Sequence, residues 1–409
     1  MRAGSGKTKG GAWEGSDRRR QASCERVMGV LRELGPSSRA EIMERTGLSR
    51  ATVSSVVAEL QAAGLVRDDE RADGTRSGQG RTPGLVRLDA AAGAALGIDF
   101  GKQHLRVAVA DLGHQILAER KVEMARDHRA EEGIDTAVAL VDEVLAEAEV
   151  SRDAIVGAGM GLPGPVDEAT GELGSTTILP GWRGVHGAAA MAERLDLPVR
   201  VDNDANLGAL SEWTWGAASG ERDVAYLKIS TGIGAGLILG GRPFRGTDGI
   251  AGEIGHTIVD ANGPVCRCGN RGCLETYVGA PALLEVLRPA HGELTVRELL
   301  ARCEAGDSGC RRVIADAGRT IGAALGTLCN LVNPGCVVVG GDLAAAGDIL
   351  LDALRDGLQR SAIPRAAAPR VVAGVLGERA EVLGAVALVL RESGRGFTAS
   401  VTARAASPA

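Results

Sequence analysis

The sequence predicts an α/β protein that begins with a small domain of helices and short strands. Two observations lead to this prediction. Short apolar segments of strand length end repeatedly at glycine-rich turns and alternate with helical segments over most of the chain. Ahead of them, three amphipathic segments precede two short alternating segments, which is the order of a winged helix-turn-helix. With 409 residues, the chain is long enough for two or three domains.

The composition is typical of a globular protein, with 44% hydrophobic and 24% charged residues. No stretch approaches the length of apolar sequence that a membrane-spanning helix needs, so we expect no membrane contact. Residues 1–20 are polar and basic and lack the apolar core of a secretory signal. We therefore predict a cytoplasmic protein with disordered tails at residues 1–20 and 396–409.

Charge is divided unevenly along the chain. Residues 1–90 contain 16 Lys and Arg but only 12 Asp and Glu, whereas the whole chain has a net charge of −6. The acidic excess therefore lies entirely in residues 91–409. A basic start on an acidic body suggests that only the start of the chain approaches a polyanion such as DNA.

Three helices are predicted within residues 21–89. They cover residues 25–34, 39–46 and 50–63. Ser38 and Ser49 stand where N-caps are favoured, immediately before the second and third helices. Gly47 allows the tight turn between these two helices. Helix, short turn with glycine and helix is the helix-turn-helix pattern, although a three-helix unit could also be only a packing module.

The exposed face of the third helix carries side chains that suit base edges and phosphates. Strands at 65–67 and 85–88 then frame a basic, glycine-rich wing whose tip suits a narrow minor groove. We predict DNA contacts from Ser49, Arg50, Thr52, Ser54 and Arg81.

One histidine and three cysteines within eighteen residues form a strong metal-binding pattern. The predicted ligands of a structural Zn²⁺ are His256, Cys266, Cys268 and Cys273. The alternatives are a disulfide or free thiols, but Cys266 and Cys268 are too close in sequence to pair well with each other. Four ligands close a tetrahedral shell, so zinc catalysis is not expected. The other five cysteines are expected to be buried thiols.

The rest of the chain alternates between strand and helix patterns. Strands are expected at 95–101, 104–110, 115–120, 155–161, 199–202, 224–230, 237–239 and 337–339, a helix at 132–148, and mostly helices near the C-terminus. Three strands end in turns that could offer backbone N–H groups to phosphate oxygens. The residues are Asp99 and Gly101, then Thr231, Gly232 and Gly234, then Gly340 and Gly341.

Four segments together resemble the ROK family (repressor, open reading frame, kinase). They are Gly252–His256, Cys266–Glu275, Asn203–Asn206 and Thr231–Gly236. The resemblance spans about residues 21–391, and the winged helix matches the transcription-factor branch of the family. It implies an actin-like, ribonuclease H-like sugar kinase fold, in which two α/β lobes surround a sugar cleft. It also implies a homodimer or a dimer of dimers.

The resemblance divides the chain into parts. They are a winged helix at 21–89, a small lobe at 92–205 completed by a C-terminal helix at about 378–395, and a large lobe with the zinc site at 206–377. It also implies which residues hold a hexose, namely Asn203, Asp204, Glu253, His256 and Glu275. These types suit the role, because carboxylates and amides pair well with adjacent hydroxyls. His256 can bind zinc through one ring nitrogen and present the other to the sugar. Helix capping is an alternative role for Asp204.

In kinases of the family, the position of Asp204 is the general base, Asp99 lies near Mg²⁺ and the glycine-rich turns hold ATP. This chain departs at the first turn, where Lys102 and Gln103 replace the Gly-Thr of the kinases. Because phosphoryl transfer depends on positioning, we predict a sugar-responsive repressor of carbohydrate metabolism that binds operator DNA and a sugar or sugar phosphate. Two alternatives remain: a regulator that is also an ATP-dependent sugar kinase, and a regulator with a vestigial pocket controlled by a partner protein.

Overall fold

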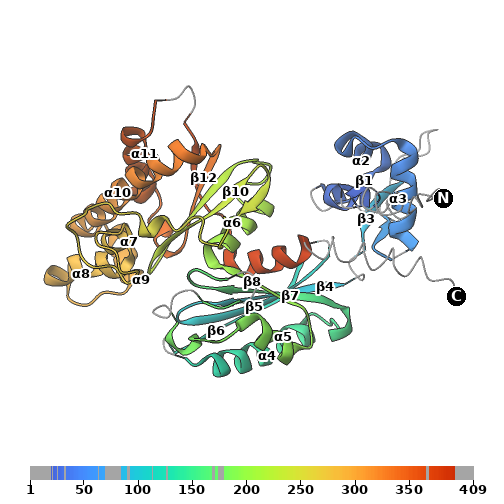
Figure 1. The fold of residues 1–409 in the computed structure, drawn as a ribbon, viewed down its shortest axis with the longest axis horizontal. Coiled ribbons are helices and arrows are strands. Elements are labelled where there is room, and N and C mark those ends of the chain that lie inside the picture. Colours follow the sequence, from blue (N-terminus) through green and yellow to red (C-terminus); the bar gives the residue numbers. More distant parts are fainter. Residues whose placement is uncertain are drawn as a thin grey trace, which may run out of the picture.

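We describe the fold from a computed structural model of the chain (Figure 1). The residues that it describes are 20, 22–24, 26–31, 34–62, 64–69, 84–89, 93–112, 114–125, 128–167, 171–173, 179–364 and 368–391. Three sheets are present in this part of the chain, one of three strands and two of five. The predicted tail at 396–409 and residues 1–19 of the other predicted tail lie outside the described residues.

The N-terminal unit has the predicted order of helices and strands. Residues 26–31 are helical and are followed by β1 (Ser37–Ser38), α2 (Arg39–Thr46), α3 (Arg50–Ala62), β2 (Val66–Asp68) and β3 (Leu85–Leu88). The strands form a small antiparallel sheet in the order β1-β3-β2. Ser38 and Glu41 form a capping box, in which each side chain accepts from the other residue's backbone N–H at 3.2 and 2.7 Å. The winged helix is therefore confirmed.

The next sheet, which we call the first lobe together with its helices, has the order β6-β5-β4-β7-β8. Its strands are β4 (Ala94–Phe100), β5 (His104–Asp111), β6 (Ile116–Glu123), β7 (Ile155–Leu162) and β8 (Val199–Asn203). The first three pair antiparallel, whereas β4, β7 and β8 pair parallel. Helices α4 (Ala130–Glu147) and α5 (Gly187–Leu195) cover one face and share its apolar core (Figure 1).

The second lobe repeats this topology. Its strands are β9 (Val224–Ile229), β10 (Ile233–Leu239), β11 (Arg242–Phe244), β12 (Cys336–Gly340) and β13 (Arg370–Ala373). Their order is β11-β10-β9-β12-β13, with the same antiparallel meander followed by parallel strands. Its helices are α7 (Glu275–Val278), α8 (Ala280–His291), α9 (Val296–Glu304), α10 (Ser308–Val332) and α11 (Asp348–Ser361). Two α/β lobes with one strand order match the predicted actin-like architecture.

Two further helices lie between the sheets, namely α6 (Asp204–Thr214) and the helix at 380–391, which is red in Figure 1. Glycines allow their close approach. A Cβ on Gly384 would come within 2.0 Å of the carbonyl oxygen of Leu207 in α6, and a Cβ on Gly97 within 2.4 Å of the carbonyl oxygen of Val382. The C-terminal helix therefore packs directly on both α6 and the first sheet.

The second glycine-rich turn is shorter than the sequence predicts. The N–H of Ser230 donates to the carbonyl of Gly232 at 2.9 Å, and β10 begins at the next residue. Gly234 and Gly236 therefore belong to β10. A Cβ on Gly236 would lie 2.3 Å from the carbonyl oxygen of Ala205, so this glycine allows α6 to approach the strand.

No helix in the described part of the chain is both long enough and apolar enough to cross a membrane, as the composition predicts.

We predict that Gly384→Ala destabilises the protein, because the added methyl group meets the backbone of Leu207. Overpacking of this kind costs about 1–3 kcal/mol, and the midpoint of thermal unfolding should fall by about 3–10 °C. Gly29→Ala is the matched control, because a Cβ there meets no atom within 4 Å. An unchanged midpoint for Gly384→Ala would contradict the close contact of the two helices.

Candidate functional site

The loop between β11 and α7 folds tightly because of its glycines. Gly269 and Gly272 have positive φ values of 93° and 62°. A Cβ on Gly272 would lie 1.6 Å from the carbonyl oxygen of Asp260, so only glycine fits there. Within the loop, the N–H of Cys266 donates to the carbonyl of Asn270 at 2.7 Å. These turns bring cysteines that are separated in sequence to one point.

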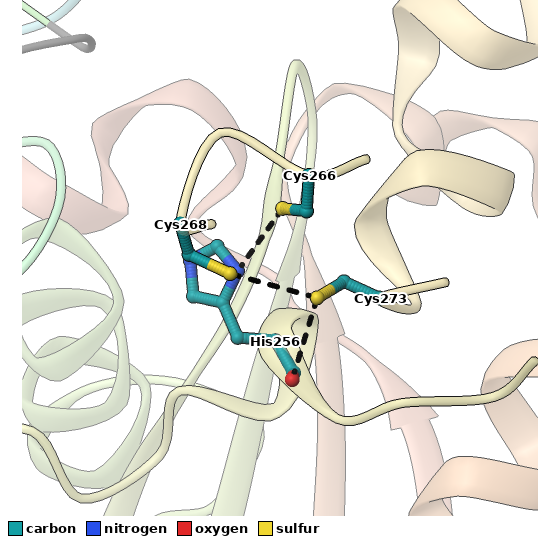
Figure 2. Close-up of side chains that lie close together, drawn as sticks. All are labelled: His256, Cys266, Cys268 and Cys273. Carbon is teal, nitrogen blue, oxygen red and sulfur yellow. Dashed lines mark hydrogen bonds between the residues drawn. The ribbon is translucent and has the colours of Figure 1, made fainter. Parts of the chain in front are cut away.

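The four predicted metal ligands converge (Figure 2). His256 Nδ1 lies 3.5 Å from the sulfur of Cys266, and the sulfurs of Cys268 and Cys273 are 3.6 Å apart. All four ligand atoms lie within 4.8 Å of one another. Ligands at zinc distances of about 2.0–2.3 Å in a tetrahedron are roughly 3.4–3.8 Å apart. The donor set and its spacing therefore fit a zinc ion. The other five cysteines are buried thiols, as predicted.

The described residues contain one other group that is close enough to hold an ion, formed by His291, Asp307 and Cys310. Asp307 caps α10 there, since its carboxylate accepts from the N–H of Cys310 at 2.9 Å. The side chain of His291 lies 3.7 Å from the other carboxylate oxygen. Capping and pairing explain this group, so we assign it a structural role.

Two carboxylates flank the imidazole of His256, as the sequence indicates. Its Nδ1, on the side of the cysteines, lies 3.8 Å from Glu275, and its Nε2 lies 3.8 Å from Glu253. The guanidinium of Arg267 donates to Glu275 at 2.5 Å. Arg267 was not predicted, although it lies between two metal ligands in the sequence. The Nε2 edge of the ring is therefore available for a different partner from the Nδ1 edge.

Asn203 and Asp204 stand where β8 ends and α6 begins. Asn203 is the N-cap of α6, because its amide oxygen accepts from the N–H of Ala205 at 2.8 Å, and its amide nitrogen donates to the carbonyl of Gly164 at 2.7 Å. Asp204 is the first residue of the helix, so the capping role that we considered for Asp204 belongs to Asn203. The cap fixes where the Asp204 carboxylate points.

Burial and neighbouring charges perturb Glu253, in the loop that carries the predicted metal ligands. Burial, followed by the charges of Asp204 and Glu275, raises the pKa of Glu253 to about 7, while Arg267 partly offsets the shift. Near neutral pH, Glu253 can therefore exist in both forms, one that donates and one that only accepts hydrogen bonds. A zinc ion at His256 would favour the charged form. The structure thus brings Glu253 and Glu275 together with His256, and the charge of Asp204 acts on Glu253.

Lys228 of β9 is the main charged residue that the sequence analysis missed. Its ammonium group lies 2.9 Å from Asp204 and 2.8 Å from Glu381 of the C-terminal helix. Burial alone would lower the pKa of Lys228, but the two carboxylates outweigh burial and hold this pKa well above its usual value. Lys228 therefore carries a positive charge at the junction of the lobes.

The first glycine-rich turn is closed by His104, a residue that no motif indicated. Its Nε2 lies 2.9 Å from the buried carboxylate of Asp99. The imidazole covers the turn, since a Cβ on Gly101 would be 2.1 Å from the ring, and the N–H of Gly101 donates to the carbonyl of His104 at 2.9 Å. Gly101 therefore has neither an open face nor a free N–H for a phosphate.

The third glycine-rich turn lies beside the second, because the hydroxyl of Ser230 donates to Asp342. A Cβ on Gly340 would meet the hydroxyl of Tyr226 at 2.2 Å, and a Cβ on Gly341 would meet the carbonyl oxygen of Ile229 at 2.5 Å. Packing therefore accounts for both glycines. Residues 231 and 232 form the tip of the β9–β10 hairpin.

This hairpin tip lies near the loop between β11 and α7 and the first residue of α7. A Cβ on Gly232 would be 2.9 Å from a carboxylate oxygen of Glu275 and 3.1 Å from the guanidinium of Arg267. Thr231 and Gly232 therefore adjoin the predicted sugar-binding residues.

The predicted DNA-reading residues lie at the start of α3. Ser49 caps this helix, because its hydroxyl accepts from the N–H of Thr52 at 3.2 Å and lies 2.8 Å from the Thr52 hydroxyl. Arg50 and Ser54 are exposed. The apolar side chains of α3 face the other way, into the core. Arg81, at the predicted wing tip, lies outside the described residues.

Comparison with known proteins agrees with these features. The sequence profile of the ROK family matches residues 95–392, most of the chain. The chain belongs to the ROK family. A profile of the MarR family matches residues 26–74 of this ROK protein, in the region of the winged helix.

The relatives of this ROK protein include both regulators and kinases. The xylose repressor of Caldicellulosiruptor bescii is 30% identical over 372 residues, which cover 87% of this chain and 92% of the repressor. The crystal structure of a ROK hexokinase from Thermus thermophilus is 33% identical, with a TM-score of 0.61, and the match covers 72% of this chain and 97% of the hexokinase.

A second crystal structure matches nearly the whole length. It is a ROK family transcriptional regulator described as a homologue of the Escherichia coli MLC protein, with a TM-score of 0.77 over 94% of this chain and 99% of its own. At 23% identity this likeness concerns the fold. The predicted fold class is confirmed.

We predict that Cys268→Ser lowers both zinc content and thermal stability, because it removes one of the four converging ligands. Metal analysis should find about one zinc per chain in the wild type and far less in the variant. A strong chelator should lower the unfolding midpoint of the wild type only.

Cys303→Ala is the control, because Cys303 is a buried thiol outside the group. Its zinc content should equal that of the wild type. Equal zinc content and equal stability in Cys268→Ser and the wild type would refute a structural metal.

Proposed function

We propose that this ROK protein is a sugar-responsive transcriptional repressor, in which a sugar bound in the ROK part changes the affinity of the winged helix for operator DNA. The observation that carries the proposal is the presence in one chain of a helix α3 with an exposed polar start and of carboxylates beside the converging histidine and cysteines. The xylose repressor relative matches over both parts. We propose that the chain is divided into a winged helix at 21–89, a small lobe at 92–205 completed by the helix at about 378–395, and a large lobe at 206–377.

The DNA-binding proposal rests on the exposed start of α3. In helix-turn-helix proteins, the N-terminal residues of the second helix contact base edges in the major groove. Arg50 can form paired hydrogen bonds with guanine, and the hydroxyls of Thr52 and Ser54 can contact bases or phosphates. The basic balance of residues 1–90 supports contact with the DNA backbone.

The sugar proposal rests on the group formed by Asp204, Glu253, His256 and Glu275. Carboxylates accept hydrogen bonds from adjacent hydroxyls, and charged acceptors make these bonds strong. Asn203 supports the group by fixing the first turn of α6. Since named relatives are a xylose repressor and a hexokinase, we propose a pentose or a hexose as the ligand.

For the metal, we propose that His256, Cys266, Cys268 and Cys273 hold a structural Zn²⁺. A bound zinc supplies a fixed positive centre that orients the imidazole, and four protein ligands leave no position for a reactive water. His256 then presents Nε2 toward Glu253 and the sugar, while the cysteines hold the loop closed.

The regulatory mechanism that we propose acts through spacing. Operator half-sites have a fixed separation, so two winged helices in a homodimer bind only when their separation matches. A sugar that binds one arrangement of the lobes more tightly shifts the population toward that arrangement. Operator affinity then falls by a factor that the ratio of the sugar's affinities for the two arrangements limits.

Kinase activity is the main alternative, and the first glycine-rich turn weighs against it. The imidazole of His104 covers Gly101 there, and Lys102 and Gln103 stand where the kinases of the family have Gly-Thr. Phosphoryl transfer depends on close positioning of the phosphates, which these residues do not favour. We therefore favour sensing of the sugar over its phosphorylation.

The test of the proposed function is operator binding with and without sugar. Full-length protein should be measured by fluorescence anisotropy on a duplex selected for wild-type binding, with D-xylose, D-glucose and their phosphates as probes. We expect at least one of these to weaken operator binding. Operator binding that no probe changes would overturn the sugar-response proposal and would favour control by a partner protein.

Glu275→Gln should weaken binding of the active sugar without changing the affinity for the operator alone. A hydrogen bond to a charged acceptor contributes about 1.5–3 kcal/mol, which corresponds to roughly 10- to 150-fold in the dissociation constant. Glu285→Gln is the control, because Glu285 is an exposed residue of α8 whose carboxylate pairs with Arg288. Calorimetric titration measures the effect, and equal sugar affinity in both variants would exclude Glu275 from the site.

Arg50→Ala should weaken operator binding by about 1–3 kcal/mol and relax the sequence preference at one base pair. Arg360→Ala is the control, because Arg360 is equally a charged surface residue but lies on α11 and pairs with Asp356. If Arg50 contacts only phosphate, the loss will be uniform across sequences and the salt dependence will fall. Unchanged affinity would contradict the proposed docking of α3.

A further inference from the structure

Lys228 is shared between two carboxylates that belong to different parts of the fold. Its ammonium group contacts Asp204 at the start of α6 and Glu381 at the start of the C-terminal helix, at 2.9 and 2.8 Å. The Glu381 side chain is only 8% exposed and the Lys228 side chain 20% exposed. Lys228 itself is on β9 of the second lobe. One ammonium group therefore ties the sugar group to the helix between the lobes.

Loss of the contact with the Lys228 ammonium group would raise the free energy of either carboxylate. A buried carboxylate without a cation is costly, and two of them near one another repel. A sugar hydroxyl that donates to Asp204 competes with Lys228 for the same negative charge. The ammonium group is then bound more strongly by Glu381. Binding at Asp204 thus changes the force on the first turn of the C-terminal helix.

The C-terminal helix leads from Glu381 toward the DNA-binding domain. Many of its buried apolar side chains belong to one cluster with the first sheet and with the core of the winged helix, whereas Ala385, Ala387 and Leu388 pack with Leu207 and Leu210 of α6. The first cluster includes Val382, Val386, Val389, Ala95, Ala108, Val27, Met28, Val53 and Val57. Close contacts of Gly97 and Gly159 with the helix backbone leave the helix little room to deform against the first sheet.

We propose that Lys228 is a positioning residue that couples sugar binding at Asp204 to the winged helix, through Glu381 and the C-terminal helix. This inference rests on the proposed function, because it concerns how the sugar signal travels. Physical coupling requires an element whose equilibrium both sites can change. The ammonium group of Lys228 is such an element, because its contacts with Asp204 and with Glu381 compete. The coupling is the ratio of operator dissociation constants with and without sugar.

Glu381→Gln is the decisive variant. It removes one carboxylate but keeps a group of the same shape, and it leaves the contact of Lys228 with Asp204 in place. Full-length protein should be compared with the wild type in operator binding, with and without the active sugar among D-xylose and D-glucose or their phosphates. We expect sugar affinity within about threefold of the wild type, while the sugar-induced change in operator affinity falls at least about fivefold.

Glu378→Gln is the matched control. Glu378 lies three residues before Glu381 and undergoes the same change, but it pairs with Arg106 and Lys121 on the first lobe and not with Lys228. Its coupling should equal that of the wild type. Lys228→Arg, which keeps the positive charge, should retain more coupling than Lys228→Met. A thermal unfolding midpoint for each variant separates loss of coupling from loss of the fold.

The possible results distinguish failure of the role of Lys228 from failure of the proposed sugar-responsive function. Wild-type protein that responds to no probe overturns the proposed function and this inference together. A responsive wild type with full coupling in Glu381→Gln overturns only the role of Lys228. Equal loss of coupling in Glu378→Gln and Glu381→Gln also overturns it, because the effect would then belong to the segment and not to the lysine.

Discussion

The direct contact between α6 and the C-terminal helix at 380–391 is the constraint on which the ROK part depends. Gly384 lets the helix backbone reach the carbonyl of Leu207, so the helices cannot be separated without opening the space between the sheets. The same helix α6 begins with Asp204. The element that joins the lobes is therefore also the element that carries Asp204 of the proposed sugar site, and a change in lobe arrangement would move this carboxylate relative to the loop with the proposed metal ligands.

The loop between β11 and α7, which carries the predicted metal ligands, is only partly held by the core. Ile254 and Leu274 are buried in the core of the second lobe, but Ile258 and Val265 are 54% and 61% exposed, so burial contributes little between them. Strand-like pairing within this loop is limited, among the described residues, to two isolated β-bridges. One joins Ile258 to Cys273, and the other joins Val265 to Arg271. A loop with so little core needs a cross-link, and the converging cysteines and histidine are suited to provide one through a metal.

Local patterns in the sequence predicted most of the elements correctly. The capping box at Ser38, the alternation of β5 and β6 and the cysteine spacing all depend on residues close together in the chain. Other features depended on tertiary contacts. Trp182 is one example, since the structure places it against Phe100, with its indole nitrogen 3.4 Å from Nε2 of His128, and almost fully buried. Packing therefore explains Trp182.

The fold class, the winged helix and the grouping of His256 with three cysteines follow from the sequence alone, because hydrophobic period, capping residues and residue spacing act over short distances in the chain. Only the tertiary structure decided that His104 closes the first glycine-rich turn and that Lys228 stands between Asp204 and Glu381. A strand residue such as Lys228 carries no local sign of its partner. Burial and the neighbouring carboxylates from other elements give its charge a role, and these are set only when the lobes pack together.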